Sequence, residues 1–159
     1  MRTRTYKLTL SGLVIALYIV IMYFTQAIAF GQYQIRLATG LYGLSYSFPF
    51  LCVPLGLANM LSNCILGGDI VNGCLGYFAG FITSKSICIL KQVTKKTHIL
   101  ALPIAIVPSL LIPIWLSYTL NVSYYILFFS LLIGQTIAAY TSGVVFIKIG
   151  ELLIFKWSE

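Results

Sequence analysis

Residues 41–84 constrain what this chain can fold into more than any other part of its sequence. One helical crossing of a bilayer takes about 20 residues, so this stretch is too long for one crossing and too short for three of ordinary length. A polar group in hydrocarbon costs on the order of several kcal/mol unless protein or trapped water satisfies it. The stretch nevertheless holds many helix breakers and polar groups: Pro49, Pro54, a run of glycines, Asn59, Asn63, Asn72 and Asp69. We therefore expect it to line a binding cavity for a small, hydrogen-bonding molecule.

The composition of the whole chain is that of a membrane protein. Of its 159 residues, 60% are hydrophobic and 8% are charged, and the mean hydropathy is +0.98. A soluble core of this size does not need so much apolar surface. We expect an all-α integral membrane protein with a single transmembrane domain over residues 1–159. The cations that give the formal charge of +7 lie at segment ends, where they contact the lipid bilayer, so no nucleic-acid partner is expected.

The positions of the cations predict the topology. Every lysine and arginine except Arg36 lies before residue 8, within 85–96 or after residue 147. If these three regions are cytoplasmic, the positive-inside rule is satisfied and both termini lie inside the cell. The chain must then cross an odd number of times within 41–84, which makes four or six crossings in all. We expect six transmembrane helices, two of them short and interrupted by proline or glycine, at about 8–30, 41–52, 54–66, 70–90, 99–120 and 122–156.

The sequence carries no enzyme signature. Its single histidine, His98, and its single acid before Glu151 cannot build a catalytic triad, a carboxylate pair or a His/Cys metal cluster inside the membrane. The four cysteines lie singly in apolar segments, where cysteine acts as a small hydrophobe. We therefore expect no metal and no other cofactor. A GxxxxGKS or GxxxxGKT motif for ATP phosphates is also missing, so active transport would need a separate ATPase.

Two polar residues outside 41–84 are candidates for substrate binding. Arg36 stands alone in the first outer loop. Its five fixed donors can orient an acceptor-rich ligand at a cavity mouth, although a solvated loop arginine is also common. Gln135 lies in the middle of the last apolar run. An amide at that depth needs a partner, which is either another helix or the ligand.

Four residues of the interrupted stretch complete the expected substrate-binding set: Asn59, Asn63, Asp69 and Asn72. An ionisable group inside the membrane is a functional candidate by default. Asp69 follows two glycines, where it can also cap the next helix. Both roles are compatible, because the start of a helix that faces a cavity also faces its ligand.

Two pairs of small residues predict close helix contacts. Gly12 and Ala16 lie four positions apart in the first apolar run and form a flat stripe on which another helix can approach closely. That helix belongs either to a partner protein or to this chain. Gly76 and Gly80 repeat the spacing, and for them we expect packing within the chain.

Several motifs in a fixed order make the chain resemble a known family. They are Leu8-Thr9 followed by Gly12, Ala16, Leu17 and Tyr18, then Gln34 and Arg36, then Asn63, Asp69 and Gly73, and finally Gly134-Gln135. With these the chain resembles the substrate-binding (S) components of energy-coupling factor (ECF) transporters, and within them the QueT family of queuosine-precursor transporters. The likeness covers nearly the whole length and depends on order and spacing, because no single motif is specific.

The resemblance implies a six-helix subunit of the bacterial plasma membrane that captures a vitamin-like molecule from outside. It implies that the subunit works with a transmembrane coupling protein, which docks at Gly12 and Ala16, and with two cytoplasmic ATPases. The implied substrate is a 7-deazapurine such as preQ0, preQ1 or queuine. Three other interpretations stay open: an S component for another vitamin-like molecule, a passive channel or secondary carrier, and an assembly subunit without a ligand.

The chain departs from the family pattern at two positions. Thr39 and Gln135 stand where the resemblance leads us to expect glutamates. One of the deazapurine precursors carries a cationic aminomethyl group, which carboxylates favour. We therefore expect a less cationic substrate, with Asp69 pairing with its donor edge through charge-assisted hydrogen bonds.

Overall fold

The computed structural model describes residues 4–31, 33–68 and 70–156, with side chains up to residue 153. All regular structure in these ranges is helical. In chain order the elements are α1 (Arg4–Phe24), α2 (Gln26–Ala29), η1 (Leu37–Tyr46), η2 (Pro49–Leu51), α3 (Cys52–Gly67), α4 (Ile70–Leu90), α5 (Thr97–Leu120), α6 (Tyr124–Ala138), η3 (Ala139–Gly143) and α7 (Val144–Lys156).

The expected class, an all-helical membrane protein, is confirmed. Within the described residues, five stretches are long and apolar enough to cross a membrane: Arg4–Phe24, Pro49–Gly67, Ile70–Leu90, Thr97–Leu120 and Tyr124–Leu153. The last of them joins α6 and α7 through η3, a short π-helix. Five of the six predicted helices therefore have a counterpart, and the helix predicted at 41–52 has none among the spans of the described chain.

The prediction of an α-helix at 41–52 is wrong. The chain forms a 3-10 helix of ten residues, η1, over Leu37–Tyr46, then the short 3-10 turn η2 before α3 begins. A 3-10 helix rarely exceeds about four residues, because its hydrogen bonds are poorly aligned. Nearly all of η1 is buried, so packing against its neighbours holds this unusual conformation.

Glycines bring η1 against η3, the π-helical segment between α6 and α7. A Cβ atom at Gly40 would collide with Ser142, and one at Gly43 would stand 2.8 Å from the Gly143 carbonyl oxygen. Ser142 Oγ also lies 2.8 Å from the carbonyl oxygen of Leu37, to which it donates a hydrogen bond. Two backbones can approach this closely only where side chains are missing, so the position of η1 depends on these glycines.

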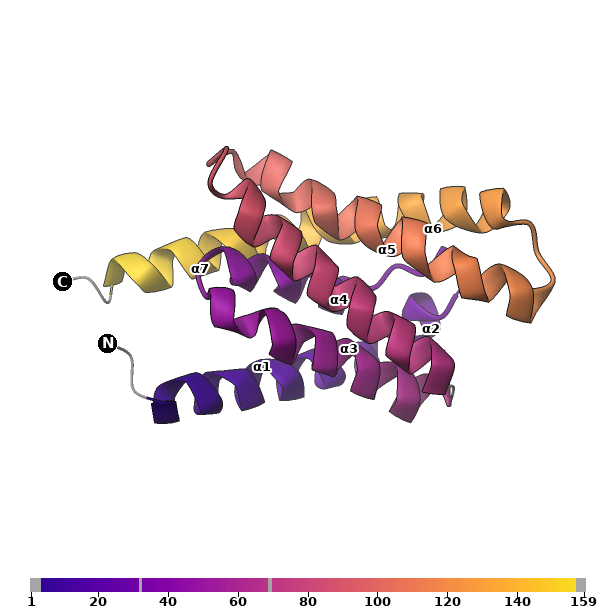
Figure 1. Ribbon diagram of the computed structural model, residues 1–159, viewed down its shortest axis with the longest axis horizontal. Coiled ribbons are helices and arrows are strands. Elements are labelled where there is room, and N and C mark those ends of the chain that lie inside the picture. Colours follow the sequence, from indigo (N-terminus) through magenta and orange to yellow (C-terminus); the bar gives the residue numbers. More distant parts are fainter. Residues whose placement is uncertain (1–3, 32, 69, 157–159) are drawn as a thin grey trace.

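The bundle has two distinct ends (Figure 1). The start of α1, the connection from α4 to α5 and the end of α7 lie at one end, and α2 and the turn from α5 to α6 lie at the other. Between them η1 runs through the interior: its last residue, Tyr46, accepts a hydrogen bond at 2.7 Å from Nζ of Lys91, which directly follows α4. The three segments from Leu37 to Leu90 therefore pass back and forth between the two ends.

The helices α3 and α4 pack through small residues, as expected for the Gly76 and Gly80 pair. A Cβ atom at Gly76 would stand 2.6 Å from Nδ2 of Asn63. At Gly80 it would stand 3.0 Å from the Tyr42 hydroxyl and 3.2 Å from the Cα atom of Gly56. The predicted packing within the chain is confirmed, and it leaves room beside α4 for polar side chains.

Candidate ligand-binding site

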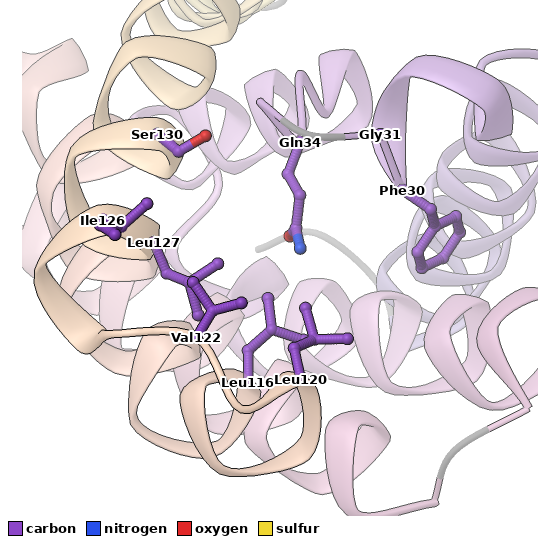
Figure 2. Close-up of a pocket in the computed structure, with 9 residues that line it drawn as sticks. All are labelled: Phe30, Gly31, Gln34, Leu116, Leu120, Val122, Ile126, Leu127 and Ser130. Atoms are coloured by element: carbon purple, nitrogen blue, oxygen red, sulfur yellow. The ribbon is translucent and has the colours of Figure 1, made fainter.

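A cavity of about 320 Å³ opens between the connection that follows α2 and the facing ends of α5 and α6. This volume lies near the lower end of the range of ligand pockets, about 300–1,000 Å³. Figure 2 shows the Gln34 side chain pointing into its middle, with Phe30 to one side and the α5 and α6 side chains opposite. The wall consists of Phe30, Gly31, Gln34, Leu116, Leu120, Val122, Ile126, Leu127 and Ser130.

Arg36 lies directly behind this wall and is 3% exposed. Its Nη1 donates to Oδ1 of Asn63 at 3.1 Å, and its Nη2 donates to Oε1 of Gln34 at 3.4 Å. The guanidinium also stands over the Phe30 ring, 5.1 Å from its centroid, in a cation–π contact. Its Nε has no hydrogen-bond partner among the described residues. Instead of being a solvated loop residue, Arg36 is a buried cation.

Two asparagines of α3 continue the network behind Arg36. Nδ2 of Asn63 donates to Oδ1 of Asn59 at 2.8 Å, and Nδ2 of Asn59 donates to the Gly76 carbonyl oxygen at 2.8 Å. Both residues are 2% exposed. Their amides are oriented by α4, and Asn63 in turn positions the guanidinium that it faces.

The other side of the network involves helix α6. Nε2 of Gln135 donates to the backbone oxygen of Gln34 at 3.1 Å. The Thr39 hydroxyl lies 2.6 Å from the backbone oxygen of Arg36 and 3.1 Å from Oε1 of Gln135, so these two acceptors share its proton. A Cβ atom at Gly134 would collide with the backbone oxygen of Tyr33. The loop before η1 therefore rests directly on α6.

Thr39 and Gln135, the two positions at which glutamates were expected, are thus direct neighbours. Two carboxylates at these positions would repel each other at close range unless they shared a proton or a cation. In this chain the pair is neutral. The only acid among the described residues, Glu151, lies beside Tyr46 at the opposite end of η1. The described network therefore has one formal charge, the cation of Arg36.

The structure brings together four of the predicted substrate-binding residues, Arg36, Asn59, Asn63 and Gln135. None of them lines the cavity. Asn72 is half-buried near the start of α4 and takes no part in the hydrogen bonds of this network within the described chain. The predicted role of Asp69 concerns a residue outside the described ranges.

Sequence reasoning missed most of the cavity wall. Phe30, Leu116, Leu120 and Leu127 have the composition of ordinary membrane helices, and nothing in their spacing marks them. Gln34 did carry a signal, because it lies two residues before the one arginine that stands outside the clusters of cations. It was named only as part of a motif, and the structure makes it the residue that connects the buried network to the cavity.

These features define a multi-pass membrane protein with a ligand-sized cavity near one end of its helical bundle. The family model of the QueT transporter matches residues 8–151, and the chain belongs to the QueT transporter family. It is a transporter, and the family resemblance read from the motifs is confirmed. Comparisons with curated proteins and with solved structures give no match.

Proposed function

We propose that this chain is the substrate-capture (S) subunit of an ATP-driven ECF importer. Its substrate is a queuosine precursor or a related 7-deazapurine (preQ0, preQ1 or queuine). The observation that carries the proposal is the cavity of about 320 Å³ with a buried arginine network directly behind it, in a chain of the QueT transporter family. The chain binds and translocates its substrate without covalent chemistry.

The arrangement of the ends supports an outward-facing cavity. The start of α1, the α4–α5 connection and the end of α7 share one end of the bundle (Figure 1), and these regions carry the clustered lysines and arginines. By the positive-inside rule that end is cytoplasmic, and so are both termini. With η1 counted as a passage, the chain crosses six times. Ten residues of 3-10 helix rise about 20 Å, which is short for a bilayer but sufficient for a segment enclosed by other helices.

The cheapest test of this proposal is copurification. An S subunit expressed with its neighbours in the cell membrane should retain a coupling protein and two ATPases after gentle solubilisation, and native mass spectrometry should detect a retained deazapurine. A chain that purifies alone and whose bound mass is absent or unrelated to deazapurines would contradict the proposal, because a secondary carrier or a channel needs no such partners.

The predicted docking stripe is open in the structure. Gly12 and Ala16 are exposed on α1, and a Cβ atom at Gly12 would meet nothing within 4 Å. We expect the double substitution Gly12→Leu with Ala16→Leu to lower recovery of the coupling protein at least tenfold, because close helix approach needs small residues. Ligand affinity and melting temperature should stay unchanged, since no described side chain of this protein packs at Gly12. Loss of ligand binding in this variant would instead assign the stripe to internal packing.

The neutral Thr39 and Gln135 pair supports a substrate without a positive charge. We expect Gln135→Glu to raise the affinity for cationic preQ1 relative to preQ0 by about tenfold. A charge at roughly 10 Å and an effective dielectric constant of about 20 gives about 1.7 kcal/mol. Gln135→Met is the matched control, because it also removes the hydrogen bond to Gln34 but adds no charge. An equal change in the two variants, measured by calorimetry, would show that charge at this position does not select the substrate.

A further inference from the structure

We infer that Gln34 is the specificity-determining residue of the cavity, and that it presents its amide Nε2 as a hydrogen-bond donor to a carbonyl-type oxygen of the ligand. Arg36 sets this orientation from behind. The inference rests on the proposed function, in which this cavity is the capture site, and it names the chemical group that the site recognises.

The first step is the orientation of the Gln34 side chain. The contact between Arg36 Nη2 and Gln34 measures 3.4 Å. A guanidinium has five donors and no acceptor, so only the oxygen of a glutamine amide can face it. The NH2 group of the same planar amide must then point away from Arg36. Because Gln34 lines the cavity and Arg36 does not, that direction is toward the cavity (Figure 2).

The second step is that the guanidinium itself cannot turn away. It is 3% exposed, bonded to Asn63 and stacked over Phe30. Asn63 is held in turn by Asn59. A buried fork held by Asn63 and Phe30 makes a rigid support. The amide of Gln34 therefore does not exchange its oxygen and nitrogen positions without losing a hydrogen bond to a charged donor.

The third step is that the backbone of Gln34 is held independently of its side chain. Its N–H donates to the Gly31 carbonyl oxygen at 3.0 Å, and its own carbonyl oxygen accepts from Gln135 at 3.1 Å. Its φ angle is +44°, a conformation that favours glycine. A side chain kept at such a position indicates a use for it, and here the side chain reaches from the buried network into the cavity.

The fourth step is the character of the remaining wall. Apart from Gln34 and Ser130 the cavity is lined by hydrocarbon and by the backbone of Gly31. A flat, neutral body fits such walls, and Phe30 offers it an aromatic surface. The ligand atom opposite Gln34 meets a donor with the positive charge of Arg36 behind it. An oxygen acceptor is favoured there, and a ligand donor at the same place is disfavoured.

The experiment compares two ligands on the purified full-length chain in lipid nanodiscs by isothermal calorimetry. The ligands are preQ0 and its analogue that lacks the ring carbonyl oxygen. We expect the wild-type chain to bind preQ0 about tenfold more tightly, the value of one hydrogen bond of about 1.4 kcal/mol. This comparison needs no variant, so it does not depend on whether a substituted chain folds.

Variants then test whether Gln34 is the residue that causes the preference for the ring carbonyl oxygen. Gln34→Met, which keeps the length of the side chain, should lower the affinity for preQ0 about tenfold. It should then bind the two ligands with equal affinity. Gln34→Glu, whose carboxylate has no hydrogen-bond donor, should lower the affinity for preQ0 by more than Gln34→Met does. Tyr33→Phe, a change on the same loop that leaves the wall untouched, should bind as the wild type does. The three variants should melt at the same temperature as the wild-type chain.

The outcomes separate this inference from the proposed function. If Leu127→Trp, which fills the cavity, abolishes binding while Gln34→Met keeps the tenfold preference, the cavity is the capture site and the inference about Gln34 is wrong. If the wild type binds both ligands equally, the inference is also wrong. If the wild type binds neither ligand, or if Leu127→Trp binds normally, the proposed substrate or site is wrong, and this inference falls with it.

Discussion

Replacing Arg36 with methionine should lower the affinity for preQ0 about a hundredfold. The guanidinium donates to Asn63 and Gln34 and stacks on Phe30. Hydrogen bonds from a charged donor contribute about 1.5–3 kcal/mol each, and loss of about 2.7 kcal/mol corresponds to a hundredfold in affinity. Without Arg36 the Gln34 amide has no fixed orientation, and two buried oxygens lose their donor. Calorimetry on the purified chain measures the change.

Two controls separate the fork geometry of Arg36 from its charge. Arg36→Lys keeps the charge but not the paired, planar donors, and it should fall between the wild type and Arg36→Met. Lys148→Met removes a cation from an exposed position on α7 and should change nothing. Normal affinity of Arg36→Met, together with a normal melting temperature, would show that the network behind the cavity has no part in binding.

The burial of Arg36 also supports our proposal that the ligand presents an oxygen acceptor to Gln34. A buried charge is costly unless it is paired and hydrogen-bonded. In the described chain this cation donates to two side-chain oxygens and stacks on one ring, the buried Tyr18 and Tyr42 lie close enough to interact with it, and no carboxylate pairs with it. A ligand carbonyl held by Gln34 adds negative partial charge close to the guanidinium. We therefore expect binding to relieve part of the electrostatic cost of burying this cation.

The fold could be predicted from the sequence wherever local signals decide it. The helix predicted at 70–90 is α4, Ile70–Leu90, and the helix predicted at 99–120 is nearly α5, because long apolar runs between cations and turns leave few alternatives. The 3-10 segment η1 could not be predicted in this way. Its conformation depends on the approach of Gly40 and Gly43 to residues about a hundred positions later, and no local pattern records such a contact.

The candidate site was only partly visible in the sequence for a related reason. Reasoning from the cost of buried polar groups singles out Asn59, Asn63 and Gln135, together with Asp69 and Asn72, and Arg36 was chosen as the lone cation of an outer loop. The structure joins Arg36, Asn59, Asn63 and Gln135 in one network. Reasoning from the sequence could not tell that these groups hydrogen-bond to one another behind the cavity, or that Gln34 is the described residue that joins their network to the cavity wall. Which polar group faces a ligand and which supports it is decided by three-dimensional packing.

The substitution Gly134→Ala tests the contact on which the loop before η1 depends. A methyl group at this position collides with the Tyr33 carbonyl oxygen, so the loop must move away from α6. The hydrogen bond from Gln135 to the Gln34 backbone is then lost, and Gln34 leaves its place in the cavity wall. We expect the affinity for preQ0 to fall at least a hundredfold. Overpacking of this kind costs about 1–3 kcal/mol, which should lower the melting temperature by roughly 5 °C.

Gly12→Ala is the matched control, because it adds the same methyl group where nothing lies within 4 Å. Alanine is the better helix former by about 1 kcal/mol, so this variant should melt at the same temperature or slightly higher and bind preQ0 normally. The position of the loop before η1 leads to one more expected result. If the contact at Gly134 holds Gln34 in place, then Gly134→Ala must also abolish the preference for the ring carbonyl oxygen. A Gly134→Ala chain that binds preQ0 with wild-type affinity and preference would show that the loop does not need to rest on α6 for the site to form.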